Sequence, residues 1–200
     1  MKNTNFKKYI IEGLLIVFSV LFALAINKLA ENYQTEEKKN IAINKIKEEL
    51  KNNSKIIKEW NVKHQEIKQN LDDILVGKND SLKSQLFKNN FLHPEILTNK
   101  KGFISSLLTN TAWETAKTTG IVSEFDFETT QKLSYVYAVQ NIIAEKSSME
   151  IINIMYDWTA KKIGENENAI LIQLNARISD LVSQEQSLEY LINNALENLK

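Results

Sequence analysis

The chain has 200 residues, with 25 basic and 25 acidic side chains, five glycines, one proline and no cysteine. Zero net charge provides no field that would recruit nucleic acid, and Arg177 alone offers the planar group that usually reads phosphates. The lack of cysteine excludes thiol catalysis, disulfides and thiolate metal sites. Scarce glycine and proline favour long helices over strands joined by tight turns.

One long apolar segment lies near the N-terminus, from Tyr9 to Asn27, and Glu12 is the single charged residue in it. At about 1.5 Å per residue it is just long enough to cross the roughly 30 Å hydrocarbon core of a bilayer. Its aliphatic and aromatic side chains favour insertion by around 5 kcal/mol, more than the roughly 3 kcal/mol cost of one carboxylate. Lys8, one helical turn before Glu12, can pair with it at the interface. We therefore predict a basic flank at residues 1–8 and a transmembrane helix at residues 9–27.

Two other interpretations of this segment remain open, a cleaved signal peptide and a buried core helix. The preceding lysines and the small-x-small sequence Ala23-Leu24-Ala25 are typical of a signal peptide. Glu12, however, lies inside what would be its apolar region, and the helical pattern continues past Asn27, so an uncleaved anchor is favoured. Lysines are denser before the span than after it. This predicts a single-pass protein of the bacterial inner membrane, with a cytoplasmic N-terminus and a periplasmic body.

The rest of the chain carries helical patterning. Apolar residues recur at alternating spacings of three and four from Ile43 to Ile74, which predicts a stalk and first bundle helix at residues 28–77. A second such seam runs from Leu171 to Leu199. Residues 78–200 should complete the bundle, with short helices at about 82–91 and 103–118, and long helices at about 127–162 and 168–199. Asp126 is expected to cap the helix that follows it.

These elements predict an all-α fold. The transmembrane helix should continue into the long first helix of the body. Long helices with short connections pack side by side in opposite directions. We therefore expect an antiparallel helical bundle with coiled-coil-like seams.

Two stretches carry a resemblance to known proteins. They are "YIIEGLLIVFSVLFALAINKLAENYQTEEKKN" (Tyr9–Asn40) and "LTNTAWETAKTTGIVSEFDFETTQKLSYVYAVQ" (Leu108–Gln140). Together they resemble a family of uncharacterised single-span, N-terminally anchored helical membrane proteins common in Bacteroidota. In that family a glutamate opens the span and an "ALQINNW"-like sequence closes it, and the matching stretch here is "ALAINKL". The resemblance implies an uncleaved span that continues as a helix, and it implies no particular activity.

Polar residues interrupt the apolar seams at Asn53, His64 and Glu185. Buried polar residues at such positions can fix helix register or oligomeric state, and Trp60 lies on the same seam as His64. A glutamate from another helix could make His64 a general base or a ligand, but a hydrogen-bonded packing histidine is favoured. No zinc, calcium, phosphate-binding or hydrolase motif is present, so we predict no catalytic residue, metal or cofactor.

The most distinctive internal stretch is "NTAWETAKTTG", Asn110 to Gly120. Trp113, Glu114 and Lys117 could line a cleft, where a buried charge would titrate usefully. The favoured interpretation is that Trp113 anchors a short helix to the bundle, and that Glu114 and Lys117 form an ordinary surface pair.

These features favour a scaffold or protein-interaction module in the bacterial envelope. Its partners would be the lipid bilayer, contacted through residues 9–27, and either a second copy of the chain or another envelope protein. The alternative is a periplasmic ligand-sensing bundle that works through a separate output partner, because only about eight residues precede the span. An enzyme is a remote third possibility, since an acid–base pair would have to assemble across helices.

Overall fold

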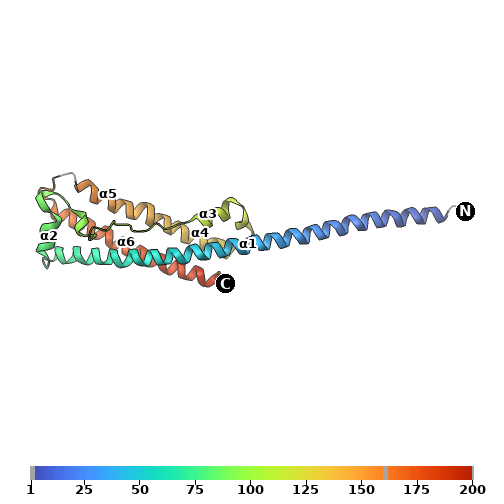
Figure 1. The fold of residues 1–200 in the computed structure, drawn as a ribbon, viewed down its shortest axis with the longest axis horizontal. Coiled ribbons are helices and arrows are strands. Elements are labelled where there is room, and N and C mark those ends of the chain that lie inside the picture. The colour runs from blue at the N-terminus through green and yellow to red at the C-terminus, as the bar shows by residue number, and fades with distance from the viewer. Residues whose placement is uncertain (1–2, 160–161, 200) are drawn as a thin grey trace.

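The computed structural model describes residues 3–159 and 162–199, and every regular element in that part of the chain is a helix (Figure 1). The protein is therefore all-α. The long helices are α1 (Asn3–Leu75), α4 (Phe127–Asn141), α5 (Ser148–Thr159) and α6 (Glu167–Asn198). The short elements are α2 (Asp80–Leu86), η1 (Lys88–Asn90), η2 (Pro94–Ile96), α3 (Thr111–Thr118), η3 (Ile121–Glu124) and the π-helical η4 (Ile142–Ser147).

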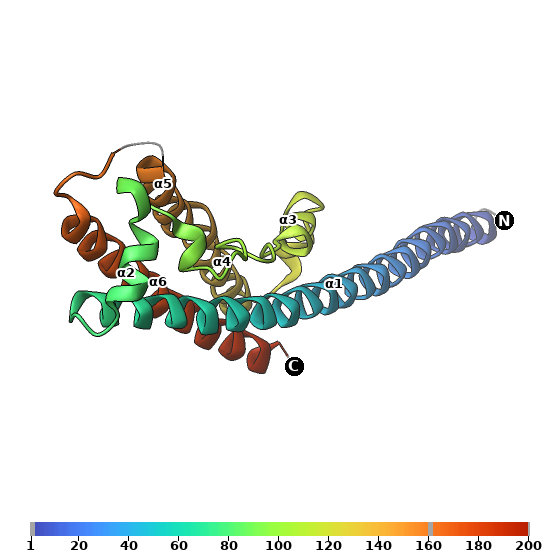
Figure 2. The same ribbon diagram turned by 60° about the vertical axis from the view of Figure 1, so that its left-hand side comes forward.

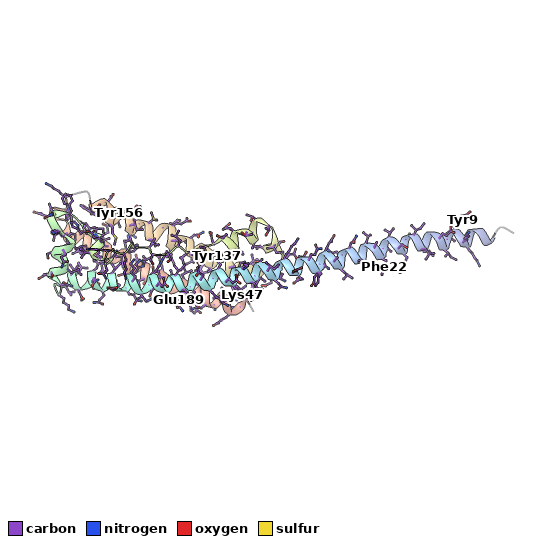
Figure 3. The ribbon with its side chains drawn as sticks, viewed as in Figure 1. Tyr9, Phe22, Lys47, Tyr137, Tyr156 and Glu189 are labelled. Atoms are coloured by element: carbon purple, nitrogen blue, oxygen red, sulfur yellow. The ribbon has the colours of Figure 1, made fainter. Side chains whose placement is uncertain are left out.

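Helix α1 is one continuous helix of 73 residues, about 110 Å long at 1.5 Å per residue. Its N-terminal part projects from the body, and Tyr9 and Phe22 point into open space there (Figure 3). This part is long and apolar enough to cross a membrane, and none of the apolar segment is buried inside the described chain. The alternative of a helix buried in the core does not describe this segment within the described chain.

Helix α6 lies along the body half of α1 (Figures 1 and 2). Asn175 Nδ2 donates to Asp72 Oδ1 at 2.9 Å, and Lys58 pairs with Glu189 at 3.4 Å. Residue numbers fall along α1 as they rise along α6, so the two helices run in opposite directions. Both seams predicted from the sequence turn inward here. The fully buried residues of this contact are Ile46, Leu50, Ile57, Ile67, Leu71, Leu171, Leu174, Ile178, Leu181, Leu188 and Ile192.

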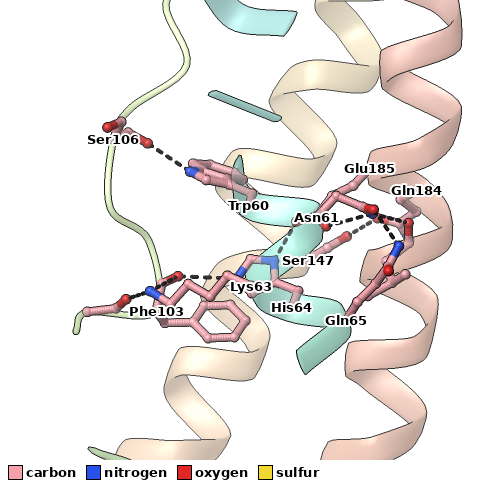
Figure 4. A network of polar contacts seen from close by, with 12 residues as sticks. Trp60, Asn61, Lys63, His64, Gln65, Phe103, Ser106, Ser147, Gln184 and Glu185 are labelled. Atoms are coloured by element: carbon pink, nitrogen blue, oxygen red, sulfur yellow. Dashed lines mark hydrogen bonds and ion pairs between the residues drawn. The ribbon is translucent and has the colours of Figure 1, made fainter. Parts of the chain in front are cut away.

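The helix predicted at about 103–118 begins only at Thr111, so that prediction is wrong for residues 103–110. These eight residues, which we call the strap, have no regular structure and lie along α1 (Figure 4). The apolar content of "FISSLLTN" is compatible with a helix. Side chains of α1 bind the backbone of the strap, however, and these contacts replace the hydrogen bonds that a helix would make within itself.

The helix predicted at about 82–91 is shorter than expected. Asn79 accepts a hydrogen bond from the backbone N–H of Leu82 at 3.0 Å, which starts α2 two residues earlier. The helix ends at Leu86, where the C-cap residue Phe87 leaves the helical conformation (φ −111°, ψ 40°), and Asn89 and Asn90 further on adopt φ values of 54° and 67°. Asparagine tolerates this left-handed conformation better than most residues, and it stops a right-handed helix.

The helix predicted at about 127–162 is interrupted. The predicted cap is confirmed, because Asp126 accepts from the N–H of Thr129 at 2.9 Å. The π-helical turn η4 then separates α4 from α5, which ends at Thr159, and Lys162 is not helical. Residues 160 and 161 lie outside the described part of the chain. A π-turn inserts one residue into the helical repeat, so that the buried positions Ile143 and Ser148 are five apart and still face the core.

Candidate functional site

The interior of the body holds a chain of polar contacts between α1, the strap and α6 (Figure 4). Trp60 Nε1 donates to the carbonyl of Ser106 at 3.1 Å. Lys63 Nζ donates to the carbonyls of Gly102 and Phe103. Burial, and then the nearby charge of Lys101, lower the pKa of Lys63. The side chains of α1 therefore bind backbone carbonyls that this irregular segment does not pair within itself, and Phe103 is its buried residue.

His64 and Glu185 form a completely buried pair between α1 and α6, each with 0% of its surface exposed. His64 Nδ1 lies 2.6 Å from Glu185 Oε1, and Nε2 lies 3.2 Å from the carbonyl of Phe103. The imidazole ring also stacks on the Phe103 ring, with centroids 4.2 Å apart. Both ring nitrogens face oxygen atoms. The contacts are satisfied by an imidazolium beside a carboxylate, or by a carboxyl group that donates to Nδ1.

The second oxygen of Glu185 is also bound. Asn61 Nδ2 donates to Glu185 Oε2 at 3.4 Å and to the carbonyl of Val182 at 3.1 Å. Each polar atom of the buried pair therefore has a protein partner, and none is presented to solvent. This geometry holds α1, the strap and α6 in one register, and it offers no site at which a substrate could contact His64.

Asn53 forms a second polar centre nearer the end of the body from which α1 projects (Figure 1). Its Nδ2 donates to the carbonyl of Thr109 at 2.6 Å and to Gln140 Oε1 at 2.9 Å, and its Oδ1 accepts from the N–H of Thr109 at 3.1 Å. Gln140 Nε2 also donates to the carbonyl of Thr109, at 3.0 Å. Asn53 therefore ties α1 to the strap and to α4. Gln140 could not be identified from the sequence, because a single glutamine in a helix does not indicate which distant residue it will contact.

Glu49 of α1 caps α3 from outside that helix. Its carboxylate accepts from the N–H groups of Ala112 and Trp113 at 2.9 and 3.4 Å, and from the hydroxyl of Tyr137 at 2.7 Å. Asn110, which immediately precedes α3, makes no side-chain hydrogen bond that would cap this helix. A carboxylate at a helix N-terminus satisfies free N–H groups and interacts favourably with the helix dipole. Sequence reasoning missed Glu49, because no local pattern links it to residues so distant in the chain.

Tyr137 and Trp113 complete this attachment. Their rings stack in parallel with centroids 5.7 Å apart. Burial, and then the hydrogen bond and charge of Glu49, raise the pKa of Tyr137 far above its ordinary value, so its hydroxyl stays a donor. Trp113 is itself buried in the core, which anchors α3 to α1 and α4.

The remaining predicted residues lie at the surface. Glu114 and Lys117 form an ion pair of 2.8 Å in which both side chains are about half exposed, and Lys117 Nζ lies 5.7 Å from the centre of the Trp113 ring. Lys8 and Glu12 approach to 3.9 Å, and both are exposed on the projecting part of α1. In the described part of the chain, no three histidine or carboxylate side chains group closely enough to hold a metal ion.

A groove lies between α1 and α3. Figure 2 shows α3 beside α1 at the end of the body nearest to the projecting helix. The volume of the groove is about 660 Å³. Both helices and η3 line it, with Lys38, Ile41, Ala42, Lys45, Glu49, Thr111, Ala112, Thr115, Thr119 and Ile121. It is separate from the buried pair and does not include Glu114 or Lys117. Sequence reasoning did not predict it, because the two walls come from helices whose approach depends on the Glu49 cap.

The fold and these contacts define an all-α protein with one helix that could cross a membrane. No protein-family model, curated protein or solved structure matches the chain. The resemblance to single-span proteins of Bacteroidota therefore stays a prediction.

Replacing Glu49 tests the cap of α3. We expect Glu49→Ala to lower the free energy of unfolding by about 2 kcal/mol, because it leaves two amides and a largely buried hydroxyl without their acceptor. Hydrogen exchange should accelerate at Ala112 and Trp113 and stay unchanged in α6. Glu48→Ala is the matched control, since Glu48 is exposed and pairs with Lys45, and neither its stability nor its exchange should change. Equal exchange in the two variants would contradict the cap.

A double-mutant cycle tests the buried pair. His64→Leu or Glu185→Leu alone should destabilise the body by about 3–5 kcal/mol, because each leaves a buried polar partner uncompensated. The double variant should be clearly more stable than the sum of the two losses predicts, since both polar groups are then gone. Urea unfolding of the detergent-solubilised chain, followed by tryptophan fluorescence, measures all four proteins. Additive losses would show that the two side chains do not depend on each other.

Proposed function

We propose that this chain is a single-pass protein of the bacterial inner membrane and that its helical body acts as a scaffold or protein-interaction module. The observation that carries the proposal is the division of α1. Its N-terminal part is apolar and has no partner in the described chain, whereas its C-terminal part is packed into a core. Apolar side chains that are exposed over a whole membrane-length segment are stable in a bilayer and costly in water.

The interior supports a structural role for the body over a catalytic one. Its most buried ionisable pair, His64 and Glu185, is saturated by protein contacts. We further infer that the body is an antiparallel bundle with coiled-coil-like seams, supported by the opposite directions of α1 and α6 and their buried apolar rows. In this proposal the exposed faces of α4 and α5, which carry Tyr135 and Tyr156, meet a second copy or another envelope protein.

A ligand-sensing bundle is the second candidate, and the groove between α1 and α3 favours it. That groove is formed in part by the helix that continues toward the membrane, so a bound molecule would contact the same helix directly. In this candidate function, α1 would pass the signal to a separate output partner.

The absence of cysteine makes the anchor and its orientation directly testable. Lys7→Cys and Asn153→Cys place one thiol on each side of the apolar segment, both at exposed positions. In cells with a permeabilised outer membrane, an impermeant maleimide should label Asn153→Cys at once and Lys7→Cys only after lysis. Intact mass of the purified protein should include residues 1–27. The opposite labelling pattern would contradict the orientation, and a mass without those residues would show a cleaved signal peptide.

The interaction role predicts a partner on the exposed helix face. A photo-crosslinking amino acid at Tyr135 or Tyr156 should give a discrete adduct in intact cells, identified by mass spectrometry as a second copy or as one envelope protein. The control position is Lys55, which is exposed on α1 and outside the faces of α4 and α5. The scaffold proposal fails if all three positions give the same diffuse background and the solubilised protein stays monomeric over a wide concentration range.

A further inference from the structure

The groove between α1 and α3 combines an apolar floor with a cationic edge. The face of α1 contributes Lys38, Ile41, Ala42 and Lys45, which lie at helical spacings of three and four. The opposite wall comes from α3 and η3, where Ala112 and Ile121 contribute further apolar surface, and it also carries three threonines.

Several polar groups in the groove are already engaged. The Glu49 carboxylate accepts from two amides and the Tyr137 hydroxyl. The hydroxyl of Thr119 donates to the carbonyl of Thr115 at 2.8 Å. Lys38 has no ion-pair or hydrogen-bond partner in the described part of the chain, and Lys45 pairs with the exposed Glu48 at 2.8 Å. The Glu49 carboxylate keeps its negative charge, because its three donors are neutral, but it lies about 16 Å along α1 from Lys38 at 1.5 Å per residue. The cation left for a ligand is therefore Lys38, with Lys45 shared with Glu48, and the complement of Lys38 is an anion.

The size of the groove favours a small molecule over a protein. Its volume of about 660 Å³ lies within the range of about 300–1,000 Å³ that small-molecule sites occupy. A stable protein interface buries about 800 Å² on each partner. Ten lining residues on two short helix faces do not offer that area.

The position of the groove distinguishes a dissolved molecule from a membrane lipid. Lys38 follows Asn27 by eleven residue steps along the helix, which is about 16 Å at 1.5 Å per residue. The headgroup layer of one leaflet is only about 5–8 Å thick. With the apolar segment in a bilayer, the groove would lie beyond the reach of a lipid that stays in its leaflet.

We propose that this groove binds a small dissolved amphiphilic carboxylate, of the size of a medium-chain fatty acid. The carboxylate lies at Lys38 and Lys45, and the apolar body packs on Ile41, Ala112 and Ile121. A bound molecule joins α1 to α3 across the groove. This site is independent of the scaffold role, and either can exist without the other.

Calorimetry with octanoate on the full chain in zwitterionic nanodiscs tests the site. After subtraction of empty nanodiscs, octanoate should bind at least about tenfold more tightly than octanol or octyltrimethylammonium, because only the carboxylate complements the lysines. Absence of octanoate binding beyond the empty-nanodisc signal would overturn the proposal. Equal binding of octanol would overturn it as well, since the lysines would then contribute nothing.

Charge reversal locates the site. Lys38→Glu with Lys45→Glu should weaken octanoate binding by at least about tenfold, since repulsion replaces attraction. The matched control is Lys51→Glu with Lys55→Glu, which makes the same change of net charge at exposed positions of the same helix and should bind as wild type does. Ile41→Asp, at a half-exposed position, should also weaken binding, and thermal unfolding verifies that each variant is folded. Wild-type affinity in the charge-reversed groove variant would refute the assignment.

Discussion

Buried polar groups need hydrogen-bond partners, and this requirement determines how the strap is attached to α1. The strap lies along α1 without a helix or a strand to satisfy its carbonyls, and only Phe103 of its eight residues is buried. Asn53, Trp60 and His64 meet that requirement from a single helix. Loss of one such contact leaves a buried donor or acceptor unpaired, which costs more than the hydrogen bond itself contributes. The strap can therefore be accommodated in one register only.

The same face of α1 performs two tasks. Apolar residues such as Leu50 and Ile57 pack against α6, and polar residues between them bind the strap, α3 and α6. Apolar packing alone would tolerate sliding of one helix by a turn, since the seams repeat every seven residues. The polar contacts do not repeat. They select one alignment of α1 with its neighbours, in the way that a single buried polar residue specifies register in a coiled coil.

Much of this architecture could be predicted from periodicity. Rows of apolar residues are local properties of the sequence, and they located the long helices α1 and α6 and the inward direction of their seams. The strap and the π-turn η4 were missed because both depend on partners distant in the chain, while their own residues suit an α-helix. His64 and Glu185 could each be recognised as exceptions in a seam. That they meet, and that Glu49 caps α3, follows only from how the helices are placed.

Between Gly13 and Gly77 the chain has neither glycine nor proline, and α1 has no break in that interval. In a bilayer, this uninterrupted helix would act as a spacer of fixed length. The body could tilt with the helix but could not fold back onto the lipid surface, and a gap of about 16 Å, at 1.5 Å per residue, would stay open beneath it. Any protein that contacts the body would have to extend at least that far from the membrane surface.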